Sequence, residues 1–367
     1  MQGVNTGETR CLGACLGAEA IRILARPRRT SSAASRHPTV PTVFIAIPTL
    51  NRPEFVRQAV QSVRDQTFQD WRILLSDNAS RSECAESVKA YVDSLQDPRI
   101  GYWRQAKNIR EYGNCCWLLE QCHEPYFMVL HDDDQIGPTY LEKAVRKLEA
   151  STGLACYFAN AVLMDAHGTV SAERTRNYRV ARGREGHPGG PMRFLEPLLR
   201  TGFIPISGTV FRHSALLAAG FVDEDCFGLW PFELNMLLRL GERDGLAWFD
   251  NEALVRYRFH DGQMQRYQGI GGDRVALAMA LQILERRRYQ GSAERTRRQV
   301  TSMFHHLQAR VAVRRGDMPA CRRSLREAIR NNPWWLRHWP LAACAFLAPP
   351  LTRALVRRID ARPPREL

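Results

Sequence analysis

The first half of the chain alternates between two patterns of apolar and polar positions. One pattern is a short, buried strand, and such strands are predicted at residues 43–47, 71–75, 99–103 and 126–130. The other is an apolar position every three or four residues, as at Val56, Val60 and Val63, which predicts a helix. Strand and helix alternate four times, which predicts a Rossmann-like α/β fold with a mostly parallel sheet flanked by helices. Ligands of such a sheet gather at the carboxyl ends of its strands.

The second half mixes further strands with helices. The helices are predicted at 140–149 and 234–240, and the strands at 155–164, 208–212 and 254–260. Residues 172–191 are rich in Arg and Gly and lack periodicity, so we predict a mobile surface loop, which would be a lid if it borders a ligand cleft. From Asp273 onward the pattern is that of long helices, with a hairpin that turns at Gly316.

Four segments differ in composition. They are a basic extension at 1–40, an α/β domain at 41–268, a helical hairpin region at 269–332 and a basic amphipathic tail at 333–367. The extension is polar without periodicity, and we predict that it is disordered. In the tail, Trp334, Trp335 and Trp339 precede an apolar stretch and a group of arginines, which is typical of a segment lying in a membrane interface. A helical cap packed on the protein, with its arginines solvated, is the alternative.

Charge and cysteine usage indicate the kind of partner and the cellular compartment of the protein. The formal net charge is +14, to which residues 1–40 contribute +4, residues 271–367 contribute +13 and the middle contributes −3. The basic, lysine-free end suggests an anionic partner, either lipid headgroups or nucleic acid. The ten cysteines include no CxxC pair, and several lie in apolar patterns, which favours reduced thiols. We therefore expect a cytoplasmic protein, peripheral on the inner face of the cell membrane if the tail binds lipid.

Three adjacent carboxylates, Asp132, Asp133 and Asp134, directly follow the fourth predicted strand. Carboxylates this close repel one another, so they cost stability unless a cation compensates them. Oxygen ligands of this kind suit a hard divalent metal ion. A solvated acidic loop is the alternative. Asp77 follows the second predicted strand, so it is expected at the same edge of the sheet.

Six segments carry a resemblance to a known family. They are residues 47–52 (IPTLNR), 59–68 (AVQSVRDQTF), 75–80 (LSDNAS), the acidic triplet with Pro138, the Glu233 segment that ends in Leu238-Arg239-Leu240, and residues 257–260 (YRFH). In this order and at these spacings they make residues 41–262 resemble the family 2 glycosyltransferases of the GT-A fold, of the inverting, bacterial surface-polysaccharide type. The α/β domain is therefore expected to be a GT-A domain followed by a helical C-terminal region.

The resemblance implies transfer of one sugar from a nucleotide-diphosphate sugar to an acceptor hydroxyl of a glycan or glycolipid, with inversion. It assigns Thr49 and Asp77 to the nucleoside, with the Asp77 carboxylate accepting a hydrogen bond from the base. Pro48 and Asn51 belong to the same matching segment and are expected to contact the nucleotide sugar. Asn108 is a further candidate contact, although loop asparagines are also common turn formers.

The resemblance also assigns the metal and the base. Asp134 matches the ligand of a Mn²⁺ or Mg²⁺ ion that bridges the diphosphate, and Asp133 matches a contact to the donor ribose or sugar. Asp132 completes the acidic cluster. His260 matches a residue that contacts the metal or the diphosphate in some relatives, and a structural or solvated histidine is the alternative. Glu233 matches the catalytic base.

Two departures and one rival function complete the prediction. Phe232 precedes Glu233 where the family often has an acidic pair, and an acid that interacts with a helix N-terminus is the alternative for Glu233. The Gln-x-x-Arg-Trp motif of processive synthases is absent, which indicates addition of one sugar at a time. The rival function is a non-catalytic protein that binds nucleic acid or a membrane through the Arg-rich helices at 286–330.

Overall fold

The computed structural model describes residues 43–221, 232–243, 245–259, 274–347 and 349–360. The predicted basic extension lies outside the described residues, and so does His260.

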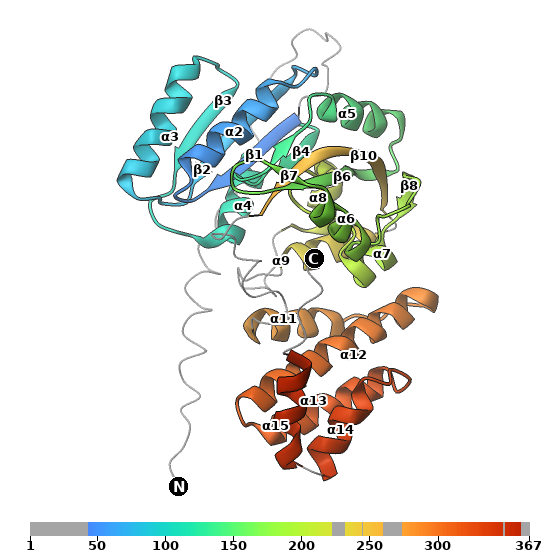
Figure 1. Ribbon diagram of the computed structural model, residues 1–367. Coiled ribbons are helices and arrows are strands. Elements are labelled where there is room, and N and C mark those ends of the chain that lie inside the picture. Colours follow the sequence, from blue (N-terminus) through green and yellow to red (C-terminus); the bar gives the residue numbers. More distant parts are fainter. Residues whose placement is uncertain (1–42, 222–231, 244, 260–273, 348, 361–367) are drawn as a thin grey trace, which may run out of the picture.

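Ten strands form a sheet in the first two thirds of the chain. They are β1 (Val43–Thr49), β2 (Trp71–Asp77), β3 (Ile100–Arg104), β4 (Tyr126–Val129), β5 (Gln135–Ile136), β6 (Leu154–Met164), β7 (Val170–Ser171), β8 (Gly190–Arg193), β9 (Val210–Arg212) and β10 (Leu246–Arg258). Their order is β3-β2-β1-β4-β9-β6-β10-β5, while β7 pairs with β6 and β8 pairs with β10 (Figure 1).

The first four strands run parallel, as the sequence pattern predicts. β1 lies between β2 and β4, and Thr49 at the end of β1 is in register with Asp77 at the end of β2. The chain builds outward from β1 to β3 and then returns to the other side of β1 with β4. This reversal is a topological switch point, so a crevice is expected outside the carboxyl ends of β1 and β4. Beyond β4 the antiparallel strand β9 joins this half to β6 and β10, which are parallel to each other.

Helices cover both faces of the sheet. They are α2 (Pro53–Arg64), α3 (Ser82–Leu95), α4 (Arg110–Glu120), α5 (Tyr140–Ala150), α6 (Ala172–Ala181), α7 (Leu195–Thr201), α8 (His213–Ala219) and α9 (Phe232–Glu242). Successive residues of β1 enter two different apolar cores, because side chains alternate between the faces of a strand. One core includes Ile45 and the buried positions of α2, α3 and α5, and the other includes Phe44 and those of α4, α7, α8 and α9. The predicted α/β class is confirmed.

The prediction of an irregular loop at 172–191 holds for the residues between α6 and β8 and is wrong for its first half. Residues 172–181 form α6, whose first turn is capped by the Ser171 side chain accepting from the Arg174 backbone amide. Near the end of this segment Arg184 is fully buried, and its Nε donates to the backbone oxygen of Phe203 at 2.9 Å. The charged composition suggested solvent exposure, whereas the fold supplies a carbonyl acceptor inside the core, as a buried guanidinium requires.

Five helices make up the C-terminal region. They are α11 (Arg274–Glu285), α12 (Gly291–Arg314), α13 (Met318–Asn331), α14 (His338–Leu347) and α15 (Pro349–Asp360). α12 and α13 form a hairpin that turns at Gly316, where φ is +79°, and the Asp317 side chain then caps α13. The buried positions of α11 pack into the core that contains α4 and α9, which attaches the helical region to the sheet (Figure 1).

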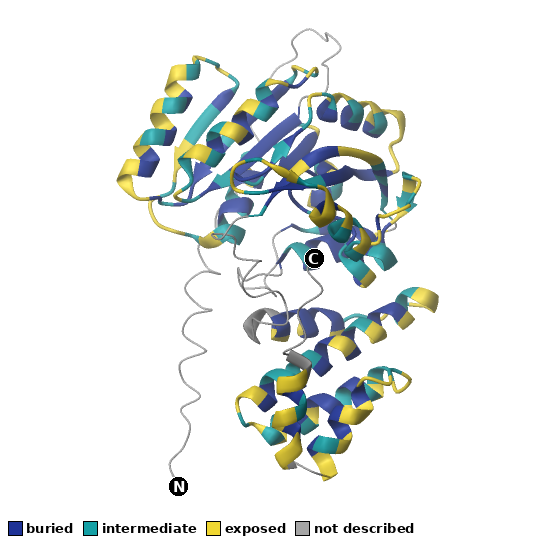
Figure 2. Cartoon of the chain, in the orientation of Figure 1, coloured by how far each residue is buried: buried dark blue, intermediate teal, exposed yellow. Residues whose placement is uncertain are grey.

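The tail has both packed and exposed apolar residues. Leu341, Ala345 and Val356 are buried in a small core with α12 and α13, as the helical-cap alternative expects. Pro349 and Pro350 begin α15, where a missing backbone N–H costs little. Trp334 is 88% exposed, however, and the surface of α14 and α15 in Figure 2 is largely yellow. None of the described helices has the length and apolarity needed to cross a membrane.

Candidate active site

Carboxylates gather at the carboxyl ends of β1 and β4, where the topology predicts a crevice. Asp132, Asp133 and Asp134 follow β4 and are all buried. Thr49, the last residue of β1, donates its hydroxyl proton to Asp132 Oδ2 at 2.7 Å. The predicted residue Thr49 therefore does contact the acidic cluster, because the parallel pairing of β1 with β4 brings the two strand ends together.

Arg52 supplies a positive charge to this cluster. One of its guanidinium nitrogens lies 3.1 Å from Asp132 Oδ1 and 3.1 Å from Asp133 Oδ2. Burial and the neighbouring Asp133 raise the pKa of Asp132 to about 6, against the opposing effects of Arg52 and Thr49. One arginine is thus insufficient to offset the crowding of three carboxylates. Arg52 was within the matching segment 47–52 but received no role from the sequence; the need for a cation was the available signal.

Asp134 is held from the other side of the crevice. Its Oδ2 accepts from the Ser207 hydroxyl at 2.6 Å, and its Oδ1 accepts from the Arg258 backbone amide at 3.2 Å. The Arg258 side chain, which is fully buried, donates to the backbone oxygen of Asp133 at 3.0 Å. Burial and Asp133 raise the pKa of Asp134 to about 7, which His131 partly opposes. Ser207 was missed because no sequence pattern links it to the triplet, and Arg258 lay in the matching segment 257–260 without receiving a role.

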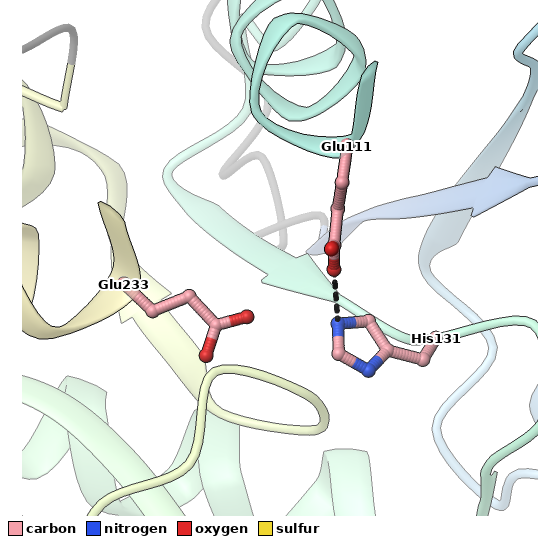
Figure 3. Close-up of side chains that lie close together, drawn as sticks. All are labelled: Glu111, His131 and Glu233. Carbon is pink, nitrogen blue, oxygen red and sulfur yellow. Dashed lines mark ion pairs between the residues drawn. The ribbon is translucent and has the colours of Figure 1, made fainter. Parts of the chain in front are cut away.

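A second group meets the acidic cluster at His131. Figure 3 shows Glu111 from α4 and Glu233 from α9 on two sides of the His131 ring. His131 Nε2 lies 3.6 Å from Glu111 Oε1, and Nδ1 lies 4.0 Å from Asp134 Oδ2. Burial by itself lowers the pKa of His131, but Glu111 and Asp134 outweigh it and raise that pKa to about 9. Burial and Glu111 raise the pKa of Glu233 to about 7.

Glu111 and His131 were also missed by the sequence reasoning. Glu111 lies in a helix that begins outside all six matching segments, and His131 directly precedes the triplet without drawing a role of its own. Glu233 was predicted, and it does face this group.

The residues predicted to hold the nucleoside lie at the end of β2 and in the adjoining loops. Asp77 is fully buried; its Oδ1 accepts from the Ser80 amide at 2.7 Å and its Oδ2 accepts from the Tyr102 hydroxyl at 2.8 Å. Pro48 is half-buried beside it in the sheet, in register with Ser76. These partners leave each Asp77 oxygen one remaining lone pair.

The loops around Asp77 are tied together by asparagines. Asn51 has a left-handed backbone with φ of 58°, and its side-chain oxygen accepts from the Arg81 amide at 2.8 Å. Asn108 is exposed, and its side-chain oxygen accepts from Asn78 Nδ2 at 3.1 Å. The side chains of Asn51 and Asn108 therefore accept hydrogen bonds within loops, as turn-forming asparagines do.

The donor set fits a hard divalent cation. His131, Asp133 and Asp134 each offer one ligand atom, and these atoms lie within 4.8 Å of one another. Burial, and then the Asp133 carboxylate, raise the pKa values of Asp132 and Asp134, and a bound cation would favour their ionised forms. Carboxylate oxygens with an imidazole nitrogen suit Mn²⁺, and carboxylates alone suit Mg²⁺.

Comparison with known proteins agrees with this geometry. The family described as "Glycosyl transferase family 2" matches residues 44–217, which hold β1 to β9 and the acidic triplet. Over these residues the chain is similar to glycosyl transferase family 2. The resemblance predicted from the six sequence segments is thereby confirmed.

One curated relative is similar to part of the chain. The chain is 30% identical over 141 residues to the GalNAc(5)-diNAcBac-PP-undecaprenol beta-1,3-glucosyltransferase of Campylobacter jejuni, which covers 36% of the chain and 42% of that relative. The chain thus spans less than half the length of this curated relative.

Two solved structures have a fold similar to that of this protein. TarS 1-349 of S. aureus in complex with UDP-GlcNAc has a TM-score of 0.58 at 12% identity, covering 87% of this chain and 91% of that one. The mannosyltransferase PcManGT of Pyrobaculum calidifontis, in complex with GDP-Man and Mn²⁺, has a TM-score of 0.52 at 12% identity and covers 95% of each chain. At these identities the likeness concerns the fold, and it extends over the helical C-terminal region.

Proposed function

We propose that this protein is an inverting, non-processive glycosyltransferase. It moves one sugar from a nucleotide-diphosphate sugar to a hydroxyl of a glycolipid or polysaccharide precursor. The observation that carries the proposal is the meeting of two carboxylate groups around His131: Asp134 Oδ2 of the acidic triplet lies 4.0 Å from Nδ1, and a Glu233 carboxylate oxygen lies within 4.8 Å of a ring nitrogen. Two neighbouring carboxylate groups offer separate places for a leaving diphosphate and an attacking hydroxyl.

Glu233 is the proposed base. Its Oε1 is buried and has no hydrogen-bond partner among the described residues, so it is available to an incoming hydroxyl. The pKa of about 7 lets the group be ionised near neutral pH and still accept a proton effectively. A single displacement needs one such base and no covalent nucleophile, so the anomeric configuration inverts. The alternative, an acid that merely interacts with the α9 dipole, does not require this unpartnered oxygen.

Asp134 is the proposed principal metal ligand, with Asp133 within reach of the same ion. His260 was predicted to join them and remains a candidate ligand outside the described residues. A bound Mn²⁺ or Mg²⁺ stabilises the negative charge that develops on a departing diphosphate. Ser207 and the Arg258 amide orient the Asp134 carboxylate toward that role, as partners of metal ligands commonly do.

The nucleotide is proposed to lie along the ends of β1 and β2. Asp77 recognises the base through the lone pairs that Ser80 and Tyr102 leave open. Pro48, Thr49 and Asn51 line the β1 side, and Asn108 lies in the loop on the far side of Asp77. Asp132 and Asp133 then face the ribose or the sugar. The UDP-GlcNAc and GDP-Man complexes of the two structural neighbours support a nucleotide sugar as the donor class.

A polyprenyl-diphosphate-linked saccharide is the proposed acceptor class. The Campylobacter relative is named for an undecaprenol-linked substrate, which supports a lipid-linked acceptor here. The exposed residues Trp334, Leu336 and Trp339, with Arg337 among them, support contact of the tail with the inner face of the cell membrane. This places the proposed activity in the cytoplasm, at the membrane surface.

Calorimetric titration with UDP, GDP and TDP, each with and without Mn²⁺, tests the nucleotide proposal. We expect one of the three to bind, and to bind more tightly with Mn²⁺, because the crowded carboxylates lack a sufficient counter-charge. ATP with Mn²⁺ is the control for unspecific phosphate binding. If none of the three diphosphates binds in either condition, the enzyme proposal fails.

Flotation with vesicles of phosphatidylglycerol tests the tail. We expect the full chain to float with these vesicles and to be released when Trp334 and Trp339 are both changed to Ala. Trp103→Ala is a matched control, because this tryptophan is 51% exposed on β3 in the sheet half. Equal flotation of both variants would remove the membrane proposal, and salt-sensitive retention on DNA in its place would favour the rival function of the arginine-rich helices.

A further inference from the structure

Glu111 is a carboxylate that neither the sequence motifs nor the proposed reaction has used. It lies in the first turn of α4, where the helix dipole favours an acid. The dipole accounts for the residue type, but it does not determine where the side chain points. In Figure 3 the Glu111 carboxylate points to the His131 ring, and the distance between Oε1 and Nε2 is 3.6 Å.

The start of α4 is held firmly in this direction. Asn78, next to Asp77, accepts from the Ile109 amide at 2.9 Å. Arg110 follows with φ of 63°, a left-handed conformation that a non-glycine residue adopts only where the surrounding structure imposes it. Further along α4, the buried Asn114 donates to the backbone oxygen of Ser76 at 2.9 Å. The polar residues at the end of β2 therefore fix the helix that carries Glu111.

His131 has a carboxylate near each ring nitrogen, at ion-pair distance and without a hydrogen bond to Nε2. Glu111 faces Nε2, Asp134 faces Nδ1 at 4.0 Å, and the His131 backbone amide donates to the Ser207 hydroxyl at 3.1 Å. Glu111, His131 and Glu233 each place one atom within 4.8 Å of the others. The ring thus lies near both Glu233 and Asp134, while Glu233 Oε1 keeps no partner among the described residues.

We propose that Glu111 is a positioning residue for the base Glu233 and that it acts through His131. This inference rests on the proposed function. As an ion-pair neighbour 3.6 Å from Nε2, Glu111 attracts the ring and keeps it from turning toward Glu233, so Glu233 Oε1 stays open to the acceptor hydroxyl. Without the Glu111 carboxylate the ring is free to pair with Glu233, and the base is then occupied in the ground state.

Turnover of Glu111→Ala tests the proposal, with UDP-GlcNAc as donor, Mn²⁺, and polyprenyl-diphosphate-linked GlcNAc as acceptor. We expect kcat to fall about tenfold, as for a displaced catalytic group, while the KM for UDP-GlcNAc stays unchanged. Glu111→Gln, which preserves size and one acceptor oxygen, should give an intermediate kcat. Glu120→Ala is the matched control, because Glu120 is exposed at the end of the same helix.

A double-mutant cycle with His131→Ala decides whether Glu111 acts through the imidazole. We expect Glu111→Ala to have no further effect on kcat when His131 is already Ala, because the shared interaction is then gone. Wild-type kcat in Glu111→Ala and Glu111→Gln, or a tenfold loss that persists without His131, overturns the positioning role alone. Absence of turnover by the wild type with UDP-GlcNAc, GDP-mannose and UDP-glucose overturns the proposed function as well.

Discussion

Buried histidines behave in opposite ways in the two halves of this protein. In the sheet half, His131 lies among Glu111, Asp134 and Glu233, which raise its pKa to about 9 in spite of burial. In the helical half, burial lowers the pKa of His306 and of His338 to about 4 each. The residue type is the same, and the difference lies in the charge of the neighbours. A carboxylate environment favours the imidazolium, and an apolar or basic one favours the neutral ring.

Hydrogen bonds in the helical half require the neutral form. The Ser302 hydroxyl donates to the backbone oxygen of Ala328 at 2.7 Å, so it accepts from His338 Nε2, which lies 2.7 Å away. His338 Nδ1 then has a lone pair and accepts from His306 Nδ1 at 3.2 Å. These successive hydrogen bonds join α12 to α13 and to the start of α14. The buried histidines of this half therefore hold helices together, whereas His131 neutralises carboxylates.

The comparison teaches that burial by itself does not identify a reactive group. Asp132, Asp134 and Glu233 have raised pKa values and lie in the crevice with few neutralising partners, as is typical of sites that bind a cation or move a proton. The pKa values of His306 and His338 are also shifted, but each of their ring nitrogens that takes part in the hydrogen-bonded series has a defined protein partner. Three measurements would sharpen or break this distinction.

The largest effect is expected for Glu233→Gln. The amide keeps the shape but cannot accept the proton of the acceptor hydroxyl, so kcat should fall roughly 10²- to 10⁴-fold. Binding of UDP with Mn²⁺, followed by calorimetry, should be unchanged, since Glu233 is not one of the residues proposed to hold the ion. In the wild type, kcat should rise with pH through about 7 as Glu233 ionises. A fully active Gln variant would require another base.

A smaller loss is expected for Asp134→Ala. Without this carboxylate the Mn²⁺-dependent part of UDP binding should weaken about 10- to 100-fold. The pKa of Asp134 is raised to about 7, so in the wild type the ion competes with a proton, and Mn²⁺ should bind more tightly at pH 8 than at pH 6. Asp165→Ala is a control, because Asp165 caps an exposed turn. Unchanged affinity in Asp134→Ala would exclude this carboxylate as a ligand.

The smallest effect is expected in the helical half, for His338→Phe. A lowered folded-state pKa means that the unfolded chain binds the proton first, so the histidine contributes stability above pH 6.5 that is lost as pH falls toward about 4. Removing the imidazole should make Tm fall less between pH 7 and pH 5, by about 2–4 °C. His123→Phe, at an exposed site, should leave the wild-type difference unchanged. Identical pH profiles for wild type and His338→Phe would contradict the neutral hydrogen-bonded chain.

The sequence by itself determined the parts that depend on local periodicity and short motifs. Continuous apolar runs predicted the parallel strands, because only a strand buried on both faces needs them. The triplet at Asp132–Asp134 marked the sheet edge where ligands gather, and Glu233 was found from its position in the family pattern. The predicted loop at 172–191 missed helix α6 and the burial of Arg184. Composition indicates exposure, but it does not show which backbone carbonyl groups accept hydrogen bonds from Arg184.

Tertiary structure alone decided which distant groups share one crevice. Arg52, Glu111, Ser207 and Arg258 come from four separate segments, and no periodicity links them to the triplet; the pairing of β1 with β4 and the anchoring of α4 on β2 bring them within bonding distance. The sequence also gave no means of distinguishing His131 from His338, because the charge of a buried imidazole is set by neighbours that only the folded chain supplies.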